Sequence, residues 1–123
     1  MAQYRYNGQV LIKTSKREDY KFAAVYLHTD GKYYKVFIST TREKVQAMID
    51  TEINTGLNTI ANHRRAIKAI EEGKDTYTVK EYGHTFTAHI KYEREDYEGW
   101  IAKNEDRIKF IEENWKIVEV EKV

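Results

Sequence analysis

Histidines and serines are the first residues to test for chemistry, because they transfer protons, attack carbonyl groups and bind metals. His84 and His89 lie five residues apart in a strand-like segment, so their side chains leave opposite faces. His63 precedes two arginines, which disfavours both a protonated imidazole and a bound metal. Neither Ser15 nor Ser39 lies in a Gly-x-Ser-x-Gly motif. These residue types therefore predict structural or surface roles.

Glycine, cysteine and carboxylate patterns add no catalytic site. The glycines are isolated along the chain, so they form no phosphate-binding loop. The absence of cysteine excludes disulfides, thiolate catalysis and cysteine-based metal sites. The acidic run 93–98 suits the positive end of a helix, which explains it without a metal. We therefore expect a protein that is not an enzyme, with no cofactor and no metal.

Composition and charge indicate one globular domain over residues 1–123. Hydrophobic residues make up 41% and charged residues 33% of the chain, enough to form a core. No apolar run reaches the roughly 18 residues of a membrane span, and the first residues lack a signal-peptide pattern. We therefore expect a cytoplasmic protein with no membrane partner.

The charge is unevenly distributed along the chain. The first fifty residues carry a net charge of +4 and residues 93–123 one of −4, a gradient compatible with a homodimer.

Turn dipeptides and apolar periodicity predict an α+β fold with a mostly antiparallel sheet and two helices. The expected order is β-hairpin, β-hairpin, long helix, β-hairpin, helix and β-strand. Hairpins are expected over 4–14, 20–41 and 76–92, and Asn7-Gly8 favours a type I′ turn in the first of them. A polar loop over 15–19 includes Arg17. A last strand covers 115–123.

Two helices are expected between these strands. The first covers 42–72, with Thr40 as N-cap, Glu43 completing a capping box, and Gly73 just past its end. Poor helix formers around Gly56 predict a kink or break there. The second helix begins with the acidic run 93–98 and ends near Asn114.

The Asp30-Gly31 hairpin sorts its residues into two faces. A two-residue type I′ turn would pair Leu27 with Tyr34, Val25 with Val36 and Ala23 with Ile38, giving one aliphatic face. The other face is then aromatic and lysine-bearing: Tyr20, Phe22, Tyr26, His28, Tyr33, Lys35 and Phe37. Such a face needs a cover, either a partner or a tryptophan of this chain (Trp100 or Trp115).

A binding role fits these features best. Ten tyrosines exceed what a core of this size needs, and tyrosine is a favoured interface side chain. We expect a protein partner with an acidic surface, such as a nucleic-acid-handling enzyme. Short cysteine-free chains rich in lysine and glutamate are common among small phage or mobile-element accessory proteins, including inhibitors. The expected partner-binding residues are Phe22, Tyr26, His28, Tyr33, Lys35, Phe37, Arg64, Arg65 and Lys68.

The alternative is a domain that binds RNA or single-stranded DNA. Aromatic side chains on a strand surface stack on unpaired bases, and nearby cations bind phosphates. Against this, the isoelectric point of about 7.9 lies below that of a typical nucleic-acid domain.

Overall fold

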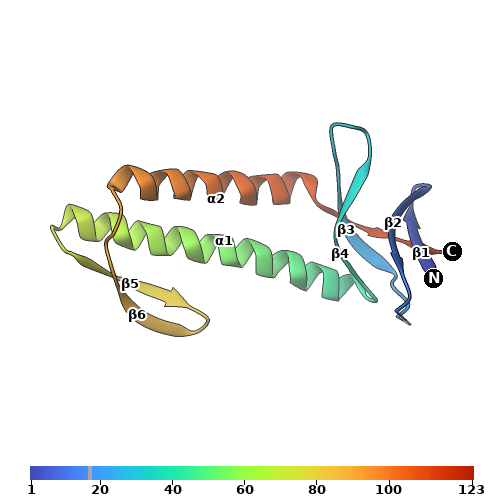
Figure 1. The fold of residues 1–123 in the computed structure, drawn as a ribbon, viewed down its shortest axis with the longest axis horizontal. Helices are drawn as coiled ribbons and strands as arrows, with labels where there is room; N and C mark the ends of the chain where they lie inside the picture. Colours follow the sequence, from blue (N-terminus) through green and yellow to red (C-terminus); the bar gives the residue numbers. More distant parts are fainter. Residues whose placement is uncertain (17) are drawn as a thin grey trace. The chain divides into compact units, whose positions relative to one another are not determined.

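The computed structural model describes residues 1–16 and 18–123 (Figure 1). Arg17, part of the expected polar loop, lies outside the described residues. Within these ranges the chain forms two helices and eight antiparallel strands, which confirms the α+β class and the expected order. The elements are β1 (Ala2–Tyr6), β2 (Gln9–Thr14), β3 (Phe22–Leu27), β4 (Tyr33–Ser39), α1 (Arg42–Glu71), β5 (Thr76–Glu81), β6 (His84–His89), α2 (Arg94–Asn114), β7 (Lys116–Glu119) and β8 (Glu121–Lys122).

The strands lie in three small sheets, and the contacts divide the chain into two compact units. The first unit comprises residues 1–52 and 111–123, with sheets ordered β2-β1-β8 and β4-β3-β7. The second comprises residues 53–110 and holds the two-stranded sheet β5-β6. Both helices contribute residues to both units, and the single domain expected from the sequence stays a prediction. Neither helix of the described ranges has an apolar stretch that would cross a bilayer.

In the first unit, the C-terminal segment completes both sheets. The expected last strand is two strands, since β7 pairs with β3 and β8 pairs with β1. Asn7 and Gly8 both have positive φ, which confirms the type I′ turn between β1 and β2.

The register of the β3–β4 hairpin differs from the expected one. Its loop has three residues, Thr29–Gly31, because the His28 N–H donates to the Lys32 carbonyl, and only Gly31 has positive φ. Tyr26 therefore faces Tyr34, and Leu27 faces Tyr33. A bulge next to Ala24 compensates for the extra loop residue, so the expected pairing of Ala23 with Ile38 is confirmed.

One face of the β4-β3-β7 sheet packs into a hydrophobic core with β1 and β2. The buried residues are Ala23, Val25 and Val118, and Tyr6, Leu11, Tyr33, Ile38 and Val120 pack against them. Beside this core the Gln9 carboxamide acts as an extra strand for the edge of β4. It donates to the Tyr33 carbonyl at 2.5 Å and accepts from the Tyr33 N–H at 2.9 Å.

Helix α1 is continuous, so the predicted break near Gly56 is wrong. A Cβ atom at Gly56 would lie 3.1 Å from Cδ1 of Ile108, which shows that the glycine allows α2 to approach α1 closely. The N-cap is Thr41 rather than Thr40, because the Thr41 hydroxyl accepts from the Lys44 N–H at 3.2 Å. Gly73 ends the helix with φ +70, as expected.

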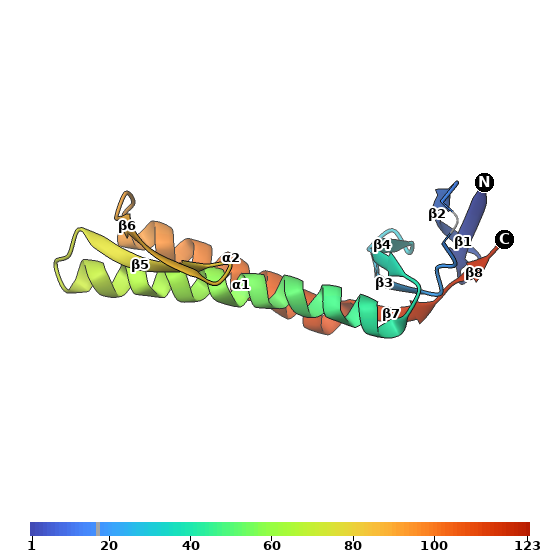
Figure 2. The same cartoon turned by 90° about the horizontal axis from the view of Figure 1, so that it is seen from below.

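In the second unit, hairpin β5–β6 runs alongside α1 (Figure 2). The edge of β5 that faces α1 is closed by helix side chains. Asn62 donates to the Lys80 carbonyl at 3.1 Å and accepts from the Lys80 N–H at 2.9 Å. Asn58 donates to the same carbonyl, and Arg65 donates to the Thr78 carbonyl. These residues replace a neighbouring strand.

The two helical glycines give matched tests of the close approach. We expect Gly56→Leu to lower the free energy of unfolding by about 1–3 kcal/mol, because the added side chain overlaps Ile108. Gly99→Leu should raise it by roughly 0.5–1 kcal/mol, because no atom lies within 4 Å of a Cβ there and leucine favours helices. Chemical denaturation measures both; equal effects would contradict the contact.

Asn62 should matter more than Asn58 for stability. Asn62→Leu removes a buried side chain and leaves the part-buried Lys80 N–H without its acceptor, so we expect a loss of about 1–3 kcal/mol in the free energy of unfolding. Asn58→Leu removes one of two bonds to the same carbonyl and should cost less than about 1 kcal/mol. A ranking in the opposite order in urea denaturation would contradict the closed-edge interpretation.

Candidate partner-binding site

The tip of the β3–β4 hairpin carries a compact, exposed aromatic cluster. We call Tyr26, His28, Asp30 and Tyr34 the hairpin-tip cluster. The rings of Tyr26 and Tyr34 are stacked with centroids 5.7 Å apart, and His28 lies edge-on to Tyr34 at 5.0 Å. Tyr34 keeps 42% of its surface exposed. In Figure 1 the cyan loop that joins β3 to β4 marks this end of the hairpin.

Asp30 holds the cluster in one geometry. One carboxylate oxygen accepts from the Tyr34 hydroxyl at 2.7 Å, and the other accepts from the Lys32 N–H at 2.9 Å. The Tyr34 hydroxyl, the Lys32 N–H and the nearby His28 lower the pKa of Asp30. In return, the hydrogen bond to Asp30 and its negative charge raise the pKa of Tyr34.

These shifts fix how the pair responds to pH. The contribution of Asp30 to stability is present above its unfolded pKa near 3.8 and is lost as the pH falls through its lower folded pKa. The contribution of Tyr34 is present below its unfolded pKa near 10.0 and is lost as the pH rises through its higher folded pKa. Near neutral pH the carboxylate is a weakened base and the phenol a weakened acid. The two shifts therefore favour the arrangement in which the neutral Tyr34 hydroxyl donates to the ionised Asp30 carboxylate.

The structure separates the residues expected on the aromatic face. Phe22, Tyr26 and Phe37 share one face with Tyr34, as their pairing with β4 and β3 requires. Phe37 packs edge-on against Trp115 at 5.9 Å, so one of the tryptophans considered as a cover does contact this face. Phe22 lies under the Arg42 guanidinium at 5.4 Å.

Tyr33 and Lys35 were wrongly placed on that face. Tyr33 packs in the core beside Tyr6, with centroids 4.9 Å apart, and the Lys116 ammonium lies 4.9 Å over its ring. Lys35 lies opposite the core residue Val25. The cause is the three-residue loop, because a shift of one residue moves every side chain near the turn to the other face.

The predicted basic turn on α1 lies in the second unit, and its three cations have different surroundings. Arg64 pairs with Glu105 of α2 at 3.4 Å, and Arg65 is held by Thr78 and Asn62. Lys68 lines a hollow of about 530 Å³ with Arg65, Ala69, Glu72, Lys74, Thr76, Tyr77, Thr78 and Thr87. The turn is therefore not a uniform cationic patch.

His63 belongs to an aromatic cluster in the second unit. Its ring lies 5.6 Å from Tyr97 and 5.4 Å from Trp100, and Tyr77 and Tyr92 surround Tyr97. Burial among these rings lowers the pKa of His63, whereas the sequence suggested neighbouring arginines as the controlling influence. Tyr97 is buried at the centre of this cluster, whereas Tyr92 stays exposed at its margin.

The carboxylates at the start of α2 cap the helix. The Asp96 carboxylate accepts from the Glu93 N–H at 3.1 Å. No group of three histidine, aspartate or glutamate side chains within residues 1–16 and 18–123 is arranged to hold a metal ion.

Sequence reasoning missed Tyr34 and Asp30 as site residues. The spacing between them offered a signal, since a residue four positions beyond a loop aspartate can return its side chain to that aspartate. The type I′ turn expected from the sequence placed Tyr34 on the aliphatic core face, so the pairing of Tyr34 with Asp30 was not considered.

Asp30→Asn should lower the pKa of Tyr34 toward its usual value near 10, because the nearby negative charge is removed. A ¹³C NMR titration of the tyrosine rings measures this pKa. Asp75→Asn, which changes an aspartate of the second unit, is the matched control and should leave Tyr34 unchanged. An identical Tyr34 titration in wild type and Asp30→Asn would refute the coupling.

The chain was also compared with known proteins. No family model, no curated protein and no solved structure matches it. Its function must therefore be argued from its own residues.

Proposed function

We propose that this chain is a non-enzymatic protein-binding module that contacts its partner through the hairpin-tip cluster. The observation that supports this proposal is the stack of the half-buried Tyr26 on the exposed Tyr34, whose hydroxyl is fixed by Asp30. An aromatic surface held in place before binding loses little conformational entropy when a partner docks. Tyrosine also offers an apolar ring and a polar hydroxyl to the same partner.

The charge of the cluster favours a protein over a nucleic acid. The ionised Asp30 carboxylate lies within the cluster, where it would repel the phosphates of a strand stacked on Tyr34. Lys35, expected to supply a cation beside these rings, lies opposite Val25 instead. A protein surface that donates hydrogen bonds to Asp30 and packs on the two tyrosines fits both features. Inhibition of a host enzyme, as by small phage accessory proteins, is the specific role we propose for such contact.

The test compares tyrosine substitutions inside and outside the hairpin-tip cluster. A double change of Tyr26→Ala and Tyr34→Ala should weaken binding to a captured and then purified partner at least tenfold, since aromatic anchors dominate interface energies. Tyr82→Ala changes a tyrosine that is 96% exposed but lies outside the cluster, and it should bind as wild type does. Isothermal titration calorimetry gives the dissociation constants, and circular dichroism verifies that each variant is folded.

Equal affinity of the double variant and wild type would refute the proposed surface. A fluorescent single-stranded oligonucleotide tests the alternative. If this oligonucleotide binds in a way that depends on Tyr34, and the affinity falls steeply between about 50 and 200 mM salt, the partner is a nucleic acid rather than a protein.

A further inference from the structure

Strand β6 has an outer edge whose backbone groups point away from its partner strand. Glu81 and His84 flank the two-residue turn and form the first hydrogen-bonded pair of the ladder. Hydrogen-bonded pairs then recur at every second residue, so Phe86 and Ala88 direct their backbone groups toward β5. The Ile90 N–H, which donates to the Asp75 carbonyl at 2.9 Å, follows the same alternation. The N–H and C=O groups of the intervening residues, Thr85, Thr87 and His89, are therefore directed outward.

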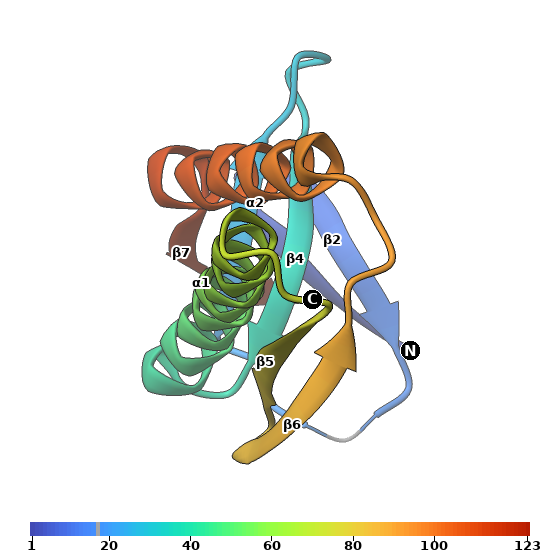
Figure 3. The same cartoon turned by 90° about the vertical axis from the view of Figure 1, so that its left-hand side faces the viewer.

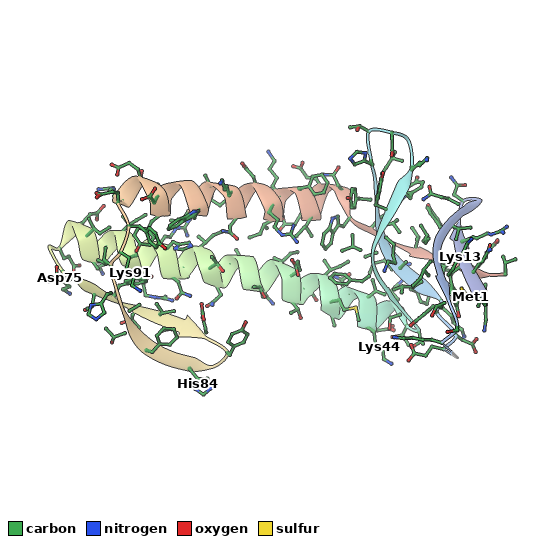
Figure 4. The ribbon with its side chains drawn as sticks, viewed as in Figure 1. Met1, Lys13, Lys44, Asp75, His84 and Lys91 are labelled. Atoms are coloured by element: carbon green, nitrogen blue, oxygen red, sulfur yellow. The ribbon has the colours of Figure 1, made fainter. Side chains whose placement is uncertain are left out.

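The two outer edges of this sheet differ in whether their backbone groups have hydrogen-bond partners. On β5 the outward groups of Lys80 and Thr78 bond to Asn62, Asn58 and Arg65 of α1. On β6 the outward groups meet no donor or acceptor within the part of the chain that the structure describes. Figures 1 and 3 show why, since β5 lies between α1 and β6. Figure 4 labels His84 near the turn of this hairpin and Asp75 and Lys91 at its other end.

The sequence of β6 also lacks the features that keep edge strands from pairing. His84-Thr-Phe-Thr-Ala-His89 contains no lysine, glutamate or proline, and its ladder with β5 has no bulge. Edge strand β4 is the contrast within this chain. It has Lys35, a bulge and the Gln9 carboxamide at its edge. The β6 edge is thus open to another strand where β4 is not.

We propose that β6 pairs antiparallel with β6 of a second copy, around a two-fold axis at Thr87. The two hairpins then form one four-stranded sheet, β5-β6-β6-β5. This pairing lies in the second unit and is separate from the hairpin-tip cluster. The proposal therefore does not depend on the proposed function.

The edge is complementary to itself in this register. Thr87 faces Thr87 of the second copy, and Thr85 faces His89 of the second copy, so every outward group finds a partner. About six hydrogen bonds join the two strands. Between these pairs, Phe86 faces Ala88 of the second copy, which covers a phenylalanine that is 48% exposed in one chain. The strand contains no lysine, arginine, aspartate or glutamate, so no such side chains of like charge face each other at the contact.

The axis at Thr87 makes a charge-swap test possible. Wild type should show twice its chain mass of 14.6 kDa by light scattering, at concentrations from about 1 to 100 µM. Thr87→Lys and Thr87→Glu each place two like charges opposite one another, and each variant alone should be monomeric. Mixed in equal amounts, the two variants should form a heterodimer, because the opposite charges then face each other.

The control is Thr78→Lys, which places the same charge on the same sheet face but on β5. This variant should remain dimeric, and so should Tyr34→Ala. A monomeric wild type throughout the concentration range would overturn the proposal. So would a dimer that persists in Thr87→Lys, or two monomeric charge variants that fail to associate when mixed.

Discussion

The structure depends on side-chain amides that complete the edges of small sheets. A sheet of two or three strands leaves a large share of its backbone groups at edges, and such groups are costly when they are buried without partners. A carboxamide has the same donor and acceptor as a peptide group, so one side chain replaces one residue of a missing strand. Gln9 does this for Tyr33, and Asn62 does it for Lys80. The first links β2 to β4, and the second fixes a hairpin on a helix.

Most of the tyrosines serve the interior rather than a surface. Tyr4 is fully buried and donates its hydroxyl to the Glu18 carbonyl, and Tyr97 is buried among other rings. Tyr6 and Tyr33 pack together beneath the Lys116 ammonium, and their contacts with this group raise the pKa of Lys116. Tyr34, Tyr82 and Tyr92 are the exposed tyrosines of the described residues, and of these Tyr34 is the one stacked on another tyrosine and bonded to a carboxylate.

The sequence predicted the helices and strands well, and their register and mutual contacts less well, because these depend on residues that are distant in sequence or on the exact loop length. The turn at Asn7-Gly8 and the helix end at Gly73 depend on only a few neighbouring residues, and the structure confirms both predictions. Asp30-Gly31 is compatible with both a two-residue and a three-residue loop. The structure has the three-residue loop, which places Tyr34 on the exposed face and Tyr33 in the core. Gly56 shows the other limit, because its role depends on Ile108, which is distant in sequence. Contacts of that kind leave no local pattern.

The division of the chain into units has a consequence for biosynthesis. Residues 53–110 form their unit from one continuous segment, whose contacts are all available once that segment has left the ribosome. The other unit needs β7 and β8, which follow that segment, to complete the sheets begun by β3 and β1. Strands β1 and β3 therefore each keep an open edge until β8 and β7 have been made. The second unit can therefore fold before the sheets of the first unit are complete.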